Sequence, residues 1–305
     1  MKNLIRTEIK FFIYSKVLIG LALLFGFFMF ATSWMSYQFC DSSLKQYNHL
    51  MQYLVDTKAD LDAEKAAQSI VYDDGTIENP LPYEIDQVEN ALSNIVPQNS
   101  ITLFGESCTL FLPIIAFLVG IVLVSSDDKN KTLKLKVASF GKQKTNISKM
   151  ISGIIILTFL IFIALIVIKL STAILYSKIQ DEYDISTFNI SIVNSNVQFS
   201  QCMFTVCSAV VYLVLGYCIS NVFHCYTFIA LAISLISFFL PTLFKYDFIN
   251  AKNTIEKCFF SFNGVVNPGE GFPLSIKTAA LEMIIICLLF IALNQLVIKK
   301  RSAYA

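Results

Sequence analysis

The feature that most constrains this chain is a run of sixty residues, from Ile185 to Phe244, without one Asp, Glu, Lys or Arg. A charged side chain at the centre of a bilayer costs about 2.5–3.5 kcal/mol on insertion scales, and a spanning helix needs about 20 apolar residues. Of the whole sequence, 55% is hydrophobic and only 15% charged, too apolar for an ordinary soluble domain. We therefore expect an all-α integral membrane protein.

The hydrophobic stretches predict six membrane-spanning helices. The sixty-residue run is too long for one helix and divides around Ser220, Asn221 and His224. Residues 1–16 carry apolar and basic side chains on opposite sides of a helix, which predicts a helix lying in the membrane interface. The predicted spans are 17–39, 105–125, 150–175, 199–221, 225–243 and 279–298, and the segments between and after them are 41–104, 126–149, 176–198, 244–278 and 299–305.

The distribution of charge predicts the orientation. Residues 1–16, residues 127–149 and the C-terminal tail hold fourteen of the 23 Lys and Arg residues, and a six-span topology places all three segments on one side. Cytoplasmic segments close to a membrane are enriched in Lys and Arg, so both termini are predicted to be cytoplasmic. The opposite side receives residues 41–104, which contain eleven Asp or Glu.

Residues 41–104 are too long for a simple loop and are predicted to form a small helical extracellular domain. Two sets of apolar residues recur there at helical spacing, with turn-forming residues between them at 71–82. We expect two amphipathic helices packed together, the first continuing the first span outward. In the segment 244–278, an amphipathic piece is predicted around Ile255–Phe262.

Several kinds of chemistry are absent from the sequence. It has no G-x-x-x-x-G-K-[ST] phosphate-binding loop, no G-x-S-x-G, no H-E-x-x-H and only two histidines, so we expect no catalytic, cofactor or metal site and no nucleic-acid partner. Glu106 and Glu282 fall at predicted outer boundaries and are interpreted as solvated interfacial acids. Cys40 and Cys258 fall near the same boundaries, where a disulfide between them or two free thiols are both compatible with the spacing.

The segment after the second span, SSDDKNKTLKLKVASFGKQKTNISKMISG (125–153), starts acidic, becomes basic and leads into the third span. It resembles the cytoplasmic loop of ABC-2 type permeases, although Lys131 stands where the family has Gly before Thr-Leu, and Ala138-Ser139-Phe140 replaces the usual Pro-Val. The resemblance implies a loop that couples the permease to an ATPase. The residues it assigns to that loop are Asp127, Asp128, Lys131, Thr132, Leu133, Lys134, Gly141 and Lys142.

The resemblance also implies a function. The chain would be the non-enzymatic permease subunit of a bacterial cell-membrane exporter, working with a separate nucleotide-binding ATPase that carries ATP and Mg²⁺ and with a second permease copy or a paralogue. We expect it to contact membrane lipid and to export amphipathic or hydrophobic peptides. The alternatives are a sensor or immunity protein that binds an outside ligand through residues 41–104, a permease for sodium or small drugs, and a secondary carrier, which would have internal repeats.

Overall fold

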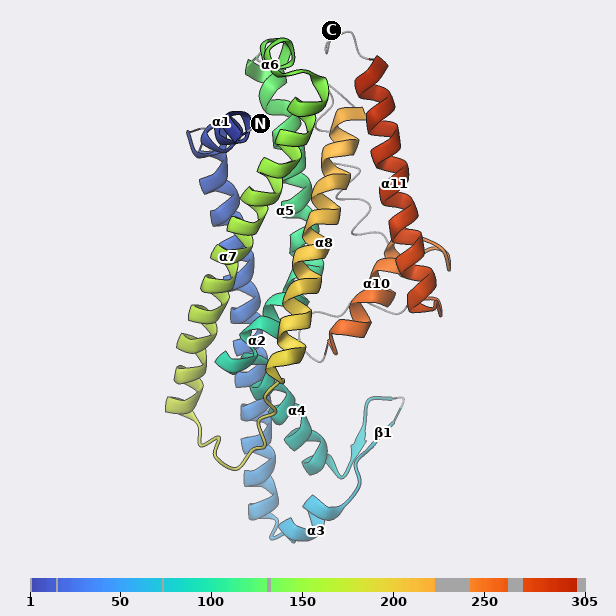
Figure 1. Ribbon diagram of the computed structural model, residues 1–305. Helices are drawn as coiled ribbons and strands as arrows, with labels where there is room; N and C mark the ends of the chain where they lie inside the picture. Colours follow the sequence, from blue (N-terminus) through green and yellow to red (C-terminus); the bar gives the residue numbers. More distant parts are fainter. Residues whose placement is uncertain are drawn as a thin grey trace.

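The computed structural model describes residues 2–14, 16–72, 74–130, 133–222, 242–262 and 271–300; of these, the side chains of 126–130, 133–134 and 300 are not described. The described chain is almost entirely helical (Figure 1). Its elements are α1 (Lys2–Tyr14), α2 (Val17–Asp56), α3 (Leu61–Ala66), β1 (Ile70–Val71), β2 (Ile77–Glu78), α4 (Pro80–Ile95), the 3₁₀ turn η1 (Pro97–Asn99), α5 (Ser100–Asn130), α6 (Leu133–Phe140), α7 (Lys142–Glu182), α8 (Ser195–Val222), α10 (Phe248–Phe259) and α11 (Ile276–Lys300).

Five of the described helices, α2, α5, α7, α8 and α11, are long and apolar enough to cross a membrane. Together they make this a multi-pass membrane protein with a helical fold. Residues 225–241 of the predicted fifth span lie outside the described residues, so a sixth span remains a prediction. Each of the five helices extends beyond its predicted span, because a helix satisfies its own backbone hydrogen bonds and need not end where the sequence becomes polar.

The extension of the long helices bears on three of the predicted segments. Helix α2 is continuous from Val17 to Asp56, as predicted for a first extracellular helix that continues the first span outward. The predicted loop 126–149 is mostly helical, being divided between the end of α5, the short helix α6 and the beginning of α7. The segment predicted as a loop at 176–198 is reduced to 183–194.

The core of the bundle is the crossing of α5 and α8. At this crossing the two backbones approach so closely that a Cβ added at Gly120 would lie 2.6 Å from the Tyr217 backbone nitrogen. A Cβ at Gly216 would lie 2.8 Å from the Cα of Phe117. Glycines at such a crossing are typical of membrane helices, which associate through close backbone packing rather than through the hydrophobic effect.

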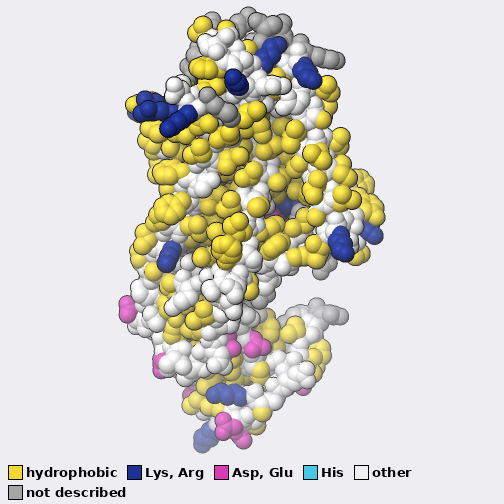
Figure 2. Space-filling view, viewed as in Figure 1, with side chains coloured by type: hydrophobic (Ala, Val, Ile, Leu, Met, Phe, Trp, Pro, Cys, Tyr) yellow, Lys and Arg dark blue, Asp and Glu magenta, His cyan; other side chains and the backbone are white. Residues whose placement is uncertain are grey.

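The opposite ends of the bundle differ in charge. On the face shown in Figure 2, Lys and Arg side chains gather at the end that carries α1 and α6, hydrophobic side chains cover the middle, and Asp and Glu side chains gather around α3 and α4. Large apolar side chains on the middle region are exposed, including Phe27 on α2, Phe162 on α7 and Leu288 on α11. A band of this kind is what lipid-facing helices present.

At the acidic end, α4 packs against the extended part of α2. Val88, Leu92 and Ile95 of α4 are buried against Cys40 and Leu44 of α2. The turn-rich segment between the two helices forms α3 and a small antiparallel hairpin, in which β1 pairs with β2.

Helix α10 differs from the amphipathic piece predicted at 255–262. It begins at Phe248 and ends at Phe259. Asp247 caps its first turn, where the Asp247 carboxylate accepts a hydrogen bond from the Asn250 amide at 2.5 Å. Its buried face is largely polar, being made of Asn250, Ala251, Asn253 and Glu256. Cys258 is an exposed free thiol on this helix, and Cys40 is a buried free thiol in α2.

Candidate functional site

The basic end of the bundle is organised by a buried ion pair between α1 and α6. The Nζ atom of Lys136 lies 2.5 Å from Oε1 of Glu8, although the two residues are 128 positions apart in the sequence. The Glu8 side chain is completely buried, and the Lys136 side chain is 16% exposed. A buried charge is tolerated when it is paired, so this contact fixes α6 against α1.

The position of Glu8 follows from the helical repeat of α1. Leu4, Glu8 and Phe12 are spaced four residues apart and form its buried stripe, whereas Lys2 and Arg6 are exposed. Apolar side chains above and below Glu8 shield it from water, and Lys136 supplies the opposite charge. The sequence predicted an amphipathic interfacial helix but did not single out the acid on its buried face.

The connection between α6 and α7 is a sharp turn at Gly141. Its φ of +82° belongs to the left-handed region that glycine adopts without strain, and a Cβ there would meet no atom within 4 Å. Thr145, in the first turn of α7, donates its hydroxyl hydrogen to the Gly141 carbonyl oxygen at 2.9 Å. The turn changes the direction of the chain, so that α6 lies across the beginning of α7 and contacts it (Figure 1).

Two further polar contacts connect α7 with its neighbours at this end. The Tyr217 hydroxyl of α8 donates to Oδ1 of Asn146 on α7 at 2.5 Å, in a buried position. The Ser152 hydroxyl of α7 lies 3.4 Å from the carbonyl oxygen of Ile5 on α1. A displacement of α6 is therefore opposed by contacts to α1, α7 and, through α7, α8.

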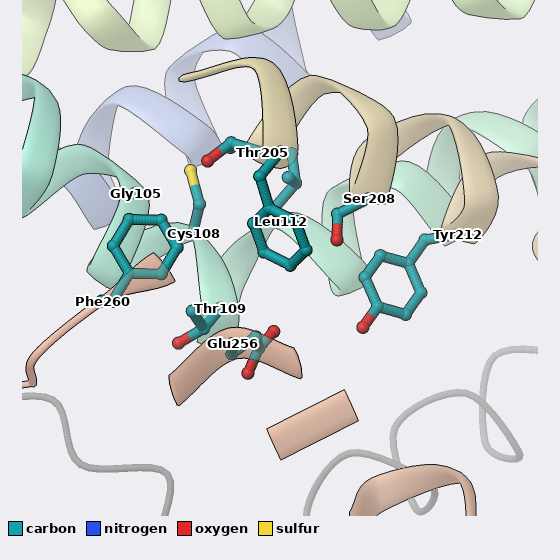
Figure 3. A pocket seen from close by; sticks show the side chains of 10 residues that line it. Gly105, Cys108, Thr109, Leu112, Thr205, Ser208, Tyr212, Glu256 and Phe260 are labelled. Carbon is teal, nitrogen blue, oxygen red and sulfur yellow. The ribbon is translucent and has the colours of Figure 1, made fainter. Parts of the chain in front are cut away.

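A second polar region lies between α5, α8 and α10 (Figure 3). It surrounds a cavity of about 10 Å³, which is room for about one water molecule. Glu256 of α10 is 2% exposed there, and its Oε2 lies 3.5 Å from Nζ of Lys252. Burial raises the pKa of Glu256 to about 7, in opposition to the attraction of Lys252.

Gln201 of α8 holds α10 in place beside this cavity. Its Nε2 donates to the Phe259 carbonyl oxygen at 2.9 Å, and its Oε1 accepts a hydrogen bond from the Thr102 hydroxyl at 2.8 Å. One side chain thereby joins α5, α8 and the end of α10. In the part of the chain that the structure describes, no group of three or more His, Cys, Asp or Glu is placed to hold a metal ion.

Comparison with known proteins identifies the family. The family model described as ABC-2 family transporter protein matches residues 2–258, which include α1, α6 and the Gly141 turn. The chain belongs to the ABC-2 transporter family. Searches of curated proteins and of solved structures give no match. The family makes this chain the membrane-spanning permease subunit of an ABC transporter and implies a separate ATPase partner.

Six of the eight residues assigned to the coupling loop have a described backbone, and these six lie at the basic end of this ABC-2 permease. The backbones of Asp127 and Asp128 belong to the last turns of α5, and those of Leu133 and Lys134 begin α6, but these four side chains are outside the described part. Lys131 and Thr132 are wholly outside it. Gly141 forms the turn described above and Lys142 begins α7, so the role of the set in coupling remains a prediction.

The contacts that fix α6 in the ABC-2 permease were not predicted. Glu8, Asn146 and Tyr217 are missing from the assigned set, and so is Lys136, which lies within the basic segment 127–149. One signal was present in the sequence, since Glu8 is the single acid in a segment of sixteen residues that carries four basic ones. The identity of its partner depends on the tertiary structure.

Proposed function

We propose that this permease exports amphipathic or hydrophobic peptides from a bacterial cell, driven by a partner ATPase that docks on α6. The observation that carries the docking proposal is the exposed surface of α6. Leu135 is 71% exposed and Phe140 is 42% exposed, on a short helix that the buried ion pair of Lys136 fixes to α1. Exposed apolar side chains on a rigid helix are suited to insertion into a groove of another protein.

In this proposal the basic end faces the cytoplasm and the acidic end faces outward. Residues 41–104 would form an extracellular domain, and ATP and Mg²⁺ would be bound by the partner. A second copy of the chain, or a paralogue, would complete the path through the membrane. The charge distribution along the bundle supports the orientation, because Lys and Arg concentrate on the cytoplasmic side of membrane proteins.

The peptide assignment rests on the chemistry of the two regions that a substrate would meet. An apolar groove of about 590 Å³ runs between α2 and α7, where Phe27, Phe30 and Phe159 are among the lining residues. Acidic side chains gather at the far end of the molecule. An amphipathic cationic peptide combines an apolar surface with a charge complementary to that end.

The docking proposal is tested by replacing Leu135 with Asp. We expect Leu135→Asp to reduce copurification of the ATPase at least tenfold, because burying a charge at an apolar contact costs well over about 1.4 kcal/mol. Val55→Asp is the matched control. Val55 is 59% exposed, but it lies near the end of α2, at the acidic end of the molecule and far from α6. Full retention of the ATPase by Leu135→Asp, combined with normal coupled hydrolysis, would exclude α6 as the docking element.

The orientation is tested by cysteine labelling in intact cells. A thiol reagent that cannot cross the membrane should label Asp74→Cys and leave Lys142→Cys unlabelled until the cells are opened. Peptide mass spectrometry separates the introduced cysteine from the native ones; among the cysteines that the structure describes, Cys207 and Cys258 are exposed. Labelling of Lys142→Cys from outside contradicts the proposed orientation.

The substrate is tested in liposomes that contain the permease and its ATPase. An amphipathic cationic peptide should stimulate ATP hydrolysis, because a ligand shifts a conformational equilibrium through unequal affinity for the states. High salt should reduce this response, since exposed charges are screened within about 8 Å at physiological ionic strength. Stimulation by sodium or by a small lipophilic cation, without a response to peptides, would replace the peptide assignment. No ATPase association at all would favour a sensor or immunity protein.

A further inference from the structure

A polar cavity of about 70 Å³ lies where α4, η1 and the beginning of α5 meet the segment before α8. Its size is several times that needed for one water molecule. Oxygen-bearing side chains dominate its wall, which is unusual next to an apolar bundle. Six of them are Ser93, Asn94, Asn99, Thr102, Glu106 and Ser261.

The wall of this cavity is held in place by its own hydrogen bonds. Asn99 donates through Nδ2 to the carbonyl oxygens of Ser93 at 2.7 Å and Ser191 at 2.8 Å, and its Oδ1 accepts from the Val193 amide at 2.9 Å. The Ser191 amide in turn donates to the Ser93 hydroxyl at 2.9 Å. These bonds fix the segment 191–193 against α4 and η1, so the oxygen atoms around the cavity are preorganised.

Glu106 places a carboxylate in this wall. It is 2% exposed, which overturns its interpretation as a solvated interfacial acid. Its Oε1 accepts a hydrogen bond from the Phe262 amide at 3.1 Å. Among the described residues, none of the ion pairs involves Glu106. Lys252 reaches α5 one turn further on, where its Nζ lies 3.4 Å from the Thr109 carbonyl oxygen, but it is paired with Glu256.

One backbone N–H does not compensate the burial of a carboxylate. Either a proton neutralises the group or a cation occupies the cavity beside it. A protonated Glu106 would need one acceptor, whereas the cavity offers many oxygen atoms in a fixed arrangement and room for a ligand. Oxygen atoms of carboxylates, hydroxyls, amides and carbonyls are the ligands that hard cations prefer.

We infer that the cavity lined by Glu106, Asn99 and Thr102 binds a monovalent metal cation of the size of Na⁺. A single carboxylate balances one positive charge, whereas Ca²⁺ sites in proteins commonly combine several carboxylates. The cation joins α5 to α4 and to the segment 191–193. It thereby stabilises the junction between the membrane bundle and the domain at its acidic end, whatever substrate the permease carries.

The test is the thermal stability of the purified permease in NaCl compared with choline chloride at equal ionic strength. The melting temperature should rise with the logarithm of the Na⁺ concentration above the dissociation constant, because a ligand that binds only the folded state stabilises it by mass action. Glu106→Gln should lose this Na⁺-specific rise. Glu89→Gln is the matched control, since Glu89 accepts a hydrogen bond from the Asn189 amide in the neighbouring segment but does not line the cavity.

Hydrogen–deuterium exchange on the unaltered chain locates the effect even if Glu106→Gln does not fold. Na⁺ should slow exchange of the amides of Ser191 and Val193, and choline should not. Equal melting temperatures in the two salts, or an equal Na⁺ response in Glu106→Gln, would overturn the inference. So would a melting temperature that depends on pH but not on the cation, which is the behaviour of a protonated Glu106.

Discussion

Replacing Lys136 with Met should destabilise the permease much more than replacing Glu8 with Gln. The two variants break the same ion pair but leave different partners behind. Lys136→Met leaves a completely buried carboxylate without its counter-charge, whereas the Lys136 side chain is 16% exposed and can turn towards water when Glu8 is replaced.

The separation of the pair sets the size of the effect. At 2.5 Å, Coulomb's law gives about 7 kcal/mol of attraction for an effective dielectric constant of about 20. Much of this offsets the cost of removing both charges from water. Removing one partner of a buried pair typically costs about 3–5 kcal/mol, which we expect for Lys136→Met. For Glu8→Gln we expect about 1–2 kcal/mol, the usual cost of an unmatched hydrogen-bonding group.

The measurement is thermal or denaturant unfolding of the purified chain in one detergent, completed as a double-mutant cycle. Glu8→Gln combined with Lys136→Met should recover most of the loss, because the pair is then replaced by neutral groups. Lys144→Met, an exposed residue at the same end, is the control and should change the unfolding free energy by less than about 0.5 kcal/mol. A loss below about 1 kcal/mol for Lys136→Met, or additive effects in the double variant, would refute a buried, coupled pair.

Three further predictions concern the bundle and α10. Gly120→Ala should cost about 1–3 kcal/mol of stability or prevent folding, because its Cβ would lie 2.6 Å from a backbone nitrogen of α8. Gly20→Ala is the control and should be neutral or slightly stabilising, since its Cβ would meet no atom within 4 Å. Equal unfolding temperatures for the two variants would contradict the tight crossing. Asp247→Ala should cost about 1 kcal/mol through loss of the α10 cap, measured by unfolding at neutral pH. Burial acts to raise the pKa of Asp247, but the backbone N–H groups that donate to its carboxylate outweigh burial, and the pKa is lowered. The destabilisation by Asp247→Ala should therefore persist above the ordinary pKa of 3.8 and shrink as the pH falls through the folded-state pKa. Glu256 has a raised pKa of about 7, so the stability that its protonated form contributes is fully present below its ordinary pKa of 4.5 and is lost as the pH rises through about 7. Glu256→Gln should flatten the dependence of the unfolding free energy on pH in this range. An unchanged pH dependence would contradict the burial of the acid.

The membrane character of the protein and the polarity of its ends could be predicted from the sequence. Both depend on local composition, because charged residues are excluded from lipid wherever they occur in the chain. The amphipathic faces of α1 and α4 were predictable for a similar reason, since the helical repeat places residues four positions apart on one side. Residues Val88, Leu92 and Ile95 are buried on α4 as that repeat predicts.

The ends of the helices could not be predicted in the same way. Hydropathy marks the part of a helix that contacts lipid, whereas the helix itself continues until its backbone hydrogen bonds find other partners. For this reason α6 and α7 occupy most of an expected loop, and α7 extends into the segment expected at 176–198. The resemblance at 125–153 nevertheless predicts the correct family from the sequence.

The sequence by itself determined that this chain enters a membrane, which helix faces are apolar and how charge is divided between its ends. The tertiary structure alone decided which polar groups are buried together. Glu8 meets Lys136 from 128 positions away, Gly120 meets α8 through its backbone, and Glu106 lies in an oxygen-lined cavity formed by four separate segments. Each of these depends on contacts between distant parts of the chain, and the free energy of a buried charge depends on what surrounds it rather than on its neighbours in sequence.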